Sequence, residues 1–189
     1  PPFLDWKLPS IGLSLLKQTV ANLNITVELL YLNVLFAKRI GVDLYHSIMV
    51  LPHHLLALEW IFSQCIIEDN SNYYFNINKS FKSRVNPYGN ASIKLSRRSE
   101  RNILMVRNAV PAFLKECVKI ITDLRPRLVG FSLHYQQRAA SLSMAKLFKQ
   151  TLPDTVIIFG GADCLGIMGK EIVKNFPFVD AVISGEGES

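Results

Sequence analysis

Cysteine is scarce in this sequence, and its spacing excludes the common cysteine-based metal sites. The 189 residues contain three cysteines, Cys65, Cys117 and Cys164, and no two of them form a C-x-x-C pair. Neither a zinc site nor an iron–sulfur cluster can be assembled from cysteine alone at this spacing. The odd number of cysteines, together with the lack of a secretory leader, predicts a chain of the reducing cytoplasm.

A long apolar run is also missing. No stretch approaches the roughly 18 to 20 apolar residues that a membrane helix needs, so we expect a soluble chain with no membrane partner. Hydrophobic residues make up 49% and charged residues 19% of the sequence, which is an ordinary globular balance. The length suits a single domain over residues 1–189, which we expect to be a piece of a longer protein.

The familiar phosphate-binding motifs are absent as well. The glycines at 160, 161 and 166 do not have the G-x-G-x-x-G spacing of a dinucleotide site. A P-loop would need Lys and Ser or Thr where Ile167 and Met168 stand. No cluster of acids follows the apolar runs, which disfavours a receiver-like or nucleotide-binding α/β domain.

Charge is concentrated in one segment. The formal net charge is +6, and seven Lys or Arg residues between 79 and 101 are opposed only by Glu100. We interpret residues 70–101 as an irregular basic insertion, because they show no sustained hydrophobic period. Aromatic residues are not regularly interleaved with the charges, so we predict no nucleic-acid partner.

The first half of the chain shows mainly helical periodicity. Helical patterns cover 33–51 and 55–67 on either side of Pro52, and the apolar run "ITVELLYL" at 25–32 predicts a strand. A further amphipathic helix is predicted over 105–124.

Three short apolar runs in the second half predict parallel strands. They are "RLVGFSL" at 127–133, "TVIIFGG" at 155–161 and "DAVISGEG" at 180–187, with helical patterns at 139–150 and 169–175 between them. This order forms βαβ units, which need a parallel sheet with right-handed crossovers. Because the runs are apolar on both sides, we expect an open, mainly parallel α/β sheet with helices on both faces.

Ligands of such sheets bind beyond the carboxyl ends of the strands. We therefore expect the loops 132–138, 160–169 and 184–189 to lie along one edge. They contain few acids or bases, so we predict no catalytic residue and no metal ligand; His134 has no Ser, Cys or Asp partner close in sequence. Small residues at such an edge suit a large preformed cofactor that carries its own reactivity.

Two segments resemble a known family. "VGFSLHYQQRAASLSMAKLFKQ" and "VIIFGGADCLGIMGKEIV" with "FPFVDAVISGEGE" are similar to the cobalamin-binding domain that precedes the radical S-adenosylmethionine barrel in enzymes of RiPP maturation. "PPF", "PSIGLSLLK", "LLYLNVLFAKRIG" and "LEWIFS" resemble the first part of the same domain, so the basic insertion is the least matched portion. The resemblance implies a Rossmann-like fold of the cobalamin-binding type.

The resemblance also implies a set of cofactor-binding residues. The residues that follow the first apolar run would face the benzimidazole tail. Those that follow the second run would let the tail pass the backbone, and those that follow the third run would close the pocket. They are Ser132, His134, Tyr135, Gln136 and Gln137; then Gly160, Gly161, Ala162 and Gly166; and then Ser184, Gly185, Glu186 and Gly187. A plain strand-end turn is the alternative interpretation of Gly160 and Gly161.

Three absences bear on this resemblance. The sequence lacks the D-x-H-x-x-G signature of the methionine-synthase-like family, whose histidine replaces the tail as the lower cobalt ligand, so we do not predict His134 to be a cobalt ligand; members of the radical type generally lack that histidine. The family begins with a strand before "PPF", so we expect the first strand of the sheet to be missing. No C-x-x-x-C-x-x-C motif occurs, so the [4Fe-4S] cluster and S-adenosylmethionine would belong to a downstream domain, and residues 1–189 alone would be inactive.

The function implied by the resemblance is cobalamin binding in a radical enzyme, a C-methyltransferase whose partner is a ribosomally made precursor peptide. One alternative is a Rossmann-like interaction module that has lost its cofactor and recruits the peptide. The sequence does not decide the oligomeric state.

Overall fold

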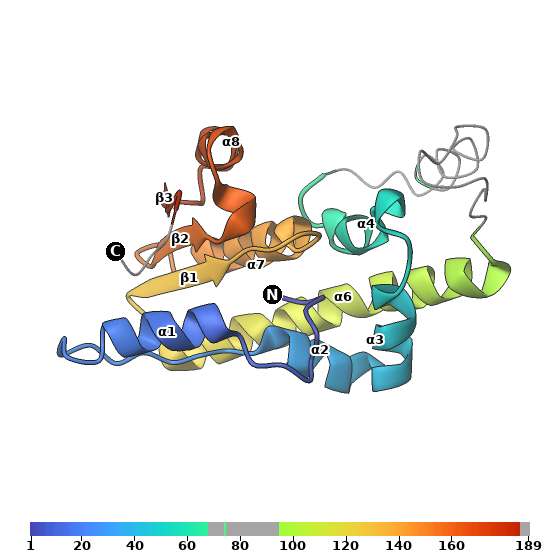
Figure 1. Ribbon diagram of the computed structural model, residues 1–189, viewed down its shortest axis with the longest axis horizontal. Helices are drawn as coiled ribbons and strands as arrows, with labels where there is room; N and C mark the ends of the chain where they lie inside the picture. The colour runs from blue at the N-terminus through green and yellow to red at the C-terminus, as the bar shows by residue number, and fades with distance from the viewer. Residues whose placement is uncertain (68–73, 75–94, 186–189) are drawn as a thin grey trace.

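The computed structural model describes residues 1–67, 74 and 95–185, with helices first along the chain and a small α/β unit last (Figure 1). The elements are α1 (Ile11–Thr19), α2 (Leu32–Ile40), α3 (Val42–Met49), η1 (His53–Leu55), α4 (Ala57–Ser63), α6 (Arg97–Leu124), β1 (Leu128–Ser132), α7 (Arg138–Thr151), β2 (Val156–Gly160), η3 (Ala162–Cys164), α8 (Ile167–Asn175) and β3 (Ala181–Val182).

The three strands form one parallel sheet in the order β1-β2-β3. Leu128 to Ser132 pair in register with Val156 to Gly160, and β3 pairs with the end of β2. Helices α7 and α8 provide the crossovers, so the expectation of an α/β chain with a parallel sheet is confirmed. All three predicted strands of the second half, and both helices between them, are present.

Only one face of this sheet is covered by helices in the described residues. Phe131, Ile157 and Phe159 are buried, and the Phe131 ring stacks on Phe148 of α7 at 6.0 Å. Leu128 and Ile183, on the opposite face, are exposed. The expectation of helices on both faces is therefore not met here. The strand order has no reversal, and right-handed crossovers then place α7 and α8 on the same face.

The strand predicted at residues 25–32 was wrong. Residues 25–31 belong to no helix or strand, and α2 already begins at Leu32. A strand is defined by its ladder, and among the described residues the sheet contains only β1, β2 and β3. The β-branched and apolar residues of this segment thus have no neighbour with which to pair.

The boundary of the basic insertion also needs correction. Residues 70–73 and 75–94 lie outside the described residues. Residues 97–101 are helical and form the start of α6. The Ser96 hydroxyl accepts a hydrogen bond from Ser99 N at 3.0 Å, and Glu100 lies in the first turn. A serine cap with an acid close behind it is a standard helix start, which moves the beginning of the helix from residue 105 to Arg97.

An aromatic cluster holds the helical layer together. Phe36, Phe62 and Phe113 come from α2, α4 and α6, and the Phe36 and Phe113 ring centroids are 4.6 Å apart. Phe3 joins them, because the buried Tyr45 hydroxyl accepts from Phe3 N at 2.8 Å and donates to Leu4 O at 2.8 Å. Burial raises the pKa of Tyr45 well above its ordinary value, so this hydroxyl keeps its proton.

The turn after β2 is tightly packed against the end of β1. Leu133 N donates to Gly160 O at 2.7 Å, and Gly161 has φ +94°. A Cβ on Gly161 would lie 2.5 Å from Leu133 O, closer than real atoms approach. The glycine at 161 is therefore required by the chain's own backbone.

We expect Gly161→Ala to lower the free energy of unfolding by about 2–4 kcal/mol, because it combines a strained φ with a backbone clash. Gly166→Ala is the matched control: its φ is +59°, but no atom lies within 4 Å of the added Cβ. The control carries an unfavourable backbone conformation (φ +59°, ψ −126°) without the clash, so it should cost less, about 1–2 kcal/mol. Urea unfolding measures both, and equal losses would contradict the packing role of Gly161.

Candidate functional site

The carboxyl ends of the strands bring most of the predicted site residues to one edge. Ser132 ends β1 and pairs with Gly160, which ends β2, and Ser184 follows β3. The sequence was right to place the three loops together. Gly185 is the last described residue of the third loop, and Glu186 and Gly187 lie outside the described residues.

Two cavities open at this edge, and they divide the predicted residues. We call the first the α8 cavity. It has a volume of about 450 Å³ and is lined by Gly166, Gly169, Lys170, Val173, Lys174, Val182 and Ser184. Two predicted residues, Gly166 and Ser184, lie here, and Gly166 N donates to the Ser184 hydroxyl at 3.1 Å.

The second, which we call the α7 cavity, has a volume of about 330 Å³. It is lined by Leu56, Glu59, Ser63, Ile66, Ile67, Tyr135, Gln136, Arg138, Ala139, Leu142, Asp163 and Phe176. Tyr135 and Gln136 are the predicted residues found here. Ser132, His134, Gln137, Gly160, Gly161 and Ala162 line neither cavity.

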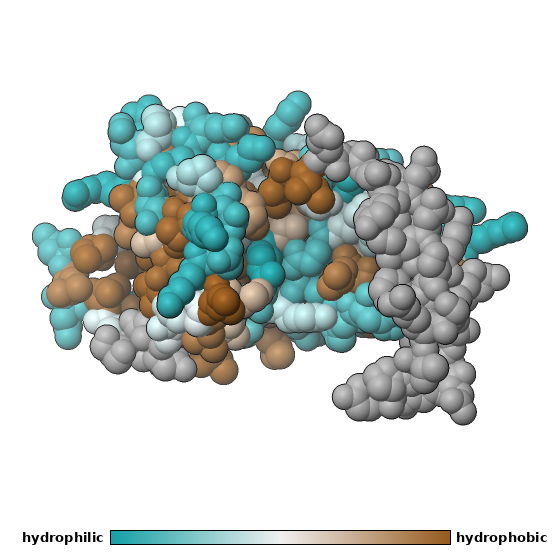
Figure 2. All heavy atoms as spheres, turned by 90° about the horizontal axis from the view of Figure 1, so that it is seen from above, coloured by the Kyte–Doolittle hydropathy of each residue, from teal (hydrophilic) through white to brown (hydrophobic). Residues whose placement is uncertain are grey.

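The surface above the edge is mixed. Figure 2 looks down on the molecule from the side of α8 and shows apolar surface lying among hydrophilic surface on the side that carries the sheet. Leu165, Ile167 and Met168, at the start of α8, contribute exposed apolar side chains. The edge therefore offers both kinds of contact to a ligand.

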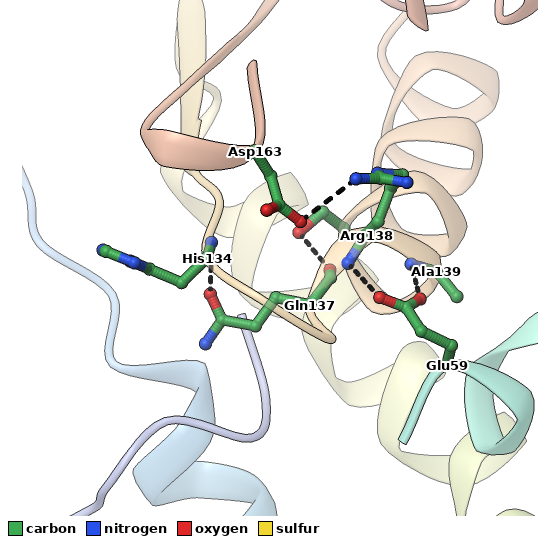
Figure 3. Close-up of polar contacts among 7 residues, drawn as sticks. Glu59, His134, Gln137, Arg138, Ala139 and Asp163 are labelled. Carbon is green, nitrogen blue, oxygen red and sulfur yellow. Dashed lines mark hydrogen bonds and ion pairs between the residues drawn. The ribbon is translucent and has the colours of Figure 1, made fainter. Parts of the chain in front are cut away.

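Glu59 is the main polar group that the sequence analysis missed. Its Oε1 accepts from Arg138 N at 3.1 Å and its Oε2 from Ala139 N at 2.6 Å, so a side chain of α4 caps the first turn of α7 (Figure 3). Gln137, the residue before α7, makes no such bond itself. Burial raises the pKa of Glu59, while the two backbone N–H groups oppose that shift.

A signal for Glu59 does exist in the sequence. It is the only acid in the apolar stretch "LLALEWIF", and Arg138 begins a helix with no Ser, Thr, Asp or Asn before it. The free N–H groups at an uncapped helix start need an acceptor, and a single acid in an apolar stretch needs a donor. Because the two lie far apart along the chain, the sequence does not show that they pair.

Arg138 and Asp163 form an ion pair beside Glu59. Arg138 Nη2 lies 3.2 Å from Asp163 Oδ2, and both side chains are half-buried. Arg138 Nε is buried and has no hydrogen-bond partner among the described residues. The pair joins the start of α7 to the turn after β2, and it places a guanidinium in the wall of the α7 cavity.

The segment "HYQQ" folds into a closed turn. His134 N donates to Gln137 Oε1 at 3.1 Å, and Gln137 is only 1% exposed (Figure 3). Gln136 has φ +61°, and its Nε2 lies 3.0 Å from His53 Nδ1. His134 and Tyr135 remain exposed, and the Tyr135 ring lies edge-on to His53 at 5.3 Å. Gln137 Oε1 and Gln136 Nε2 therefore form their hydrogen bonds with groups of the chain itself.

In the part of the chain that the structure describes, no group of three or more His, Cys, Asp or Glu residues is arranged to hold a metal ion. Burial raises the pKa of Cys164, which disfavours a reactive thiolate at this edge. Among the described residues, no helix combines the length and apolar character needed to cross a membrane.

Comparisons of the chain with protein-family models, with curated proteins and with solved structures found no match. The case for a function therefore depends on the edge and its two cavities.

The pH dependence of stability tests the environment of Glu59. Because its pKa is raised in the folded chain, its contribution is greatest at acidic pH and is lost as the pH rises through the folded pKa. We expect the wild type to lose stability relative to Glu59→Gln in urea unfolding as the pH rises above about 4.3, the ordinary pKa of a glutamate. Glu116→Gln, which removes a carboxylate ion-paired with Arg39 at 2.7 Å, is the control. A wild-type advantage that grows with pH would contradict the buried environment.

Proposed function

We propose that this chain is the cobalamin-binding domain of a radical S-adenosylmethionine enzyme, a C-methyltransferase that matures a ribosomally made peptide. The observation that carries the proposal is the meeting of three loops at the carboxyl edge of a parallel sheet, next to the α8 cavity. Such edges are where α/β sheets bind ligands. The resemblance of these loops to the family supplies the identity of the ligand.

The residues of the α8 cavity fit the nucleotide tail of cobalamin. Val173 and Val182 give it apolar walls for a flat ring, and Lys170 and Lys174 are available to the tail phosphate. An added Cβ at Gly166 would meet no atom within 4 Å, so this loop leaves room at the mouth. About 450 Å³ suits part of a ligand of this size, and the remainder would lie over the edge.

Some residue roles change in this proposal. Gly161 lies against the backbone of Leu133, and Gln137 accepts a hydrogen bond from His134 N. We therefore assign structural roles, and not cofactor contact, to Gly161 and Gln137. Gly166 and Ser184 are the strongest candidates for cofactor contact. When bound, methylcobalamin supplies the methyl group and its chemistry, and this chain binds and orients it. The cluster, S-adenosylmethionine and the peptide would belong to the rest of the enzyme.

The outer edge of β1 supports a further strand in the complete fold. Val156 N donates to Arg127 O and Leu133 N to Gly160 O, so the backbone groups of Leu128, Gly130 and Ser132 point away from β2. Among the described residues these groups have no strand partner. We include in the proposal that the first strand of the family pairs here.

An interaction module without cofactor is the second candidate. Helix α1 favours it, because none of its residues is buried and Ile11 and Leu15 are exposed. Such a face suits contact with another polypeptide.

Retention of cobalamin separates the two candidates. We expect the purified chain, incubated with hydroxocobalamin and desalted, to elute coloured, with a visible spectrum that lacks a coordinated lower base. Val173→Trp should lower the retained cobalt at least about tenfold by filling the α8 cavity. Val34→Trp on α2 is the matched control, since the two valines are 40% and 42% exposed.

Colourless wild-type protein at saturating hydroxocobalamin, also in a chain that carries the upstream strand, would reject the cofactor and favour the interaction module. Equal retention by both tryptophan variants would move the cofactor out of the α8 cavity.

A further inference from the structure

The α7 cavity is a second site, built from different residues. Its walls are apolar, with Leu142 and Phe176 on one side and the exposed Leu56 and Ile67 at the rim. Tyr135 adds an exposed aromatic ring. A cavity of about 330 Å³ with such walls is large enough for a small apolar group.

Polar groups of both kinds lie in the same walls. The Arg138 guanidinium donates to Asp163 through Nη2, and that is its only hydrogen bond among the described residues. In the same described part of the chain, Asp163 Oδ1 and Gln136 Oε1 accept no hydrogen bond. The cavity thus has unused donors and unused acceptors within one set of lining residues.

The polar groups of the cavity select against a ligand that has only donors or only acceptors. Two acids, Glu59 and Asp163, and one guanidinium, Arg138, line it. A ligand carboxylate would offer acceptors only and would approach the negative charge of Asp163. A ligand ammonium would offer donors only and would leave the unused donors of Arg138 unpaired. A neutral group with one acceptor and one donor satisfies both sets of protein groups.

We propose that the α7 cavity binds a carboxamide attached to an apolar body, with the carbonyl facing Arg138 and the N–H facing Asp163 or Gln136. Glu59 does not contact the ligand, because both of its oxygens are bonded to the first turn of α7. It positions Arg138 by holding that residue's backbone. The proposal does not depend on the cobalamin proposal, since the α8 and α7 cavities share no lining residue.

The probe is 4-methylpentanamide, whose only polar group is the carboxamide, titrated into the ¹⁵N-labelled chain without cobalamin. We expect saturable shifts of the Arg138 and Ala139 backbone amides, with affinity in the millimolar range for so small a ligand. 4-Methylpentanoate, which has the same shape but a carboxylate in place of the carboxamide, should bind at least about fivefold more weakly because it approaches the acids of the cavity.

Two variants make the test specific. Arg138→Met should weaken binding of the amide by about tenfold, the value of one hydrogen bond to a charged group. Its matched control is Arg39→Met, because Arg39 forms a similar ion pair with Glu116 and is 35% exposed against 33% for Arg138. Asp163→Asn should narrow the preference for the amide over the acid. A thermal melt of each variant establishes that it is folded.

The proposal is overturned if the acid binds as tightly as the amide, if Arg138→Met binds the amide like the wild type, or if the shifts map elsewhere. The source of the natural carboxamide follows from competition. If hydroxocobalamin displaces the probe, one of the cofactor's peripheral amides occupies the cavity. If a bound probe persists at saturating hydroxocobalamin, the amide comes from a peptide.

Discussion

The contact between α4 and α7 is the constraint on which the rest of the structure depends. Glu59 caps α7, the Ser143 hydroxyl donates to Phe62 O at 2.9 Å, and Lys146 donates to Cys65 O at 3.2 Å. These bonds run along one side of α7 and fix its rotation and its height against the helical layer. The sheet then follows, because β1 and β2 are the two strands that α7 connects.

This arrangement explains why both cavities open at the same edge. Because Glu59 of α4 caps α7, the side chain of Gln137 does not have to cap this helix. The loop after β1 can therefore form a turn that is closed by the hydrogen bond from His134 N to Gln137 Oε1. The turn exposes His134 and Tyr135 and buries Gln136 and Gln137. Leu133 of the same loop lies against Gly161, so the position of the turn after β2 also depends on this loop.

The parts that the sequence could predict are those with local causes. Strands β1, β2 and β3 and the helices α7 and α8 between them follow from short-range periodicity and from the Gly and Pro residues that bound these segments. The strand at 25–32 failed, because a strand needs a partner that periodicity does not supply. Glu59 was missed because its partners are 79 and 80 residues away. Gly161 was expected to let the cofactor tail pass the backbone, with a strand-end turn as the alternative, and the group that lies against it in the structure is the backbone of Leu133.

The unpaired outer edge of β1 has a consequence for the behaviour of the chain at high concentration. Exposed edge strands act as templates for pairing with other strands, and natural proteins usually guard them with charge, proline or a bulge. In the described residues, β1 has the sequence "LVGFS" and no such guard within it, and its first residue, Leu128, is apolar and exposed. Among the described residues, the outer edge of β1 is therefore the place at which a strand of another copy of the chain would pair.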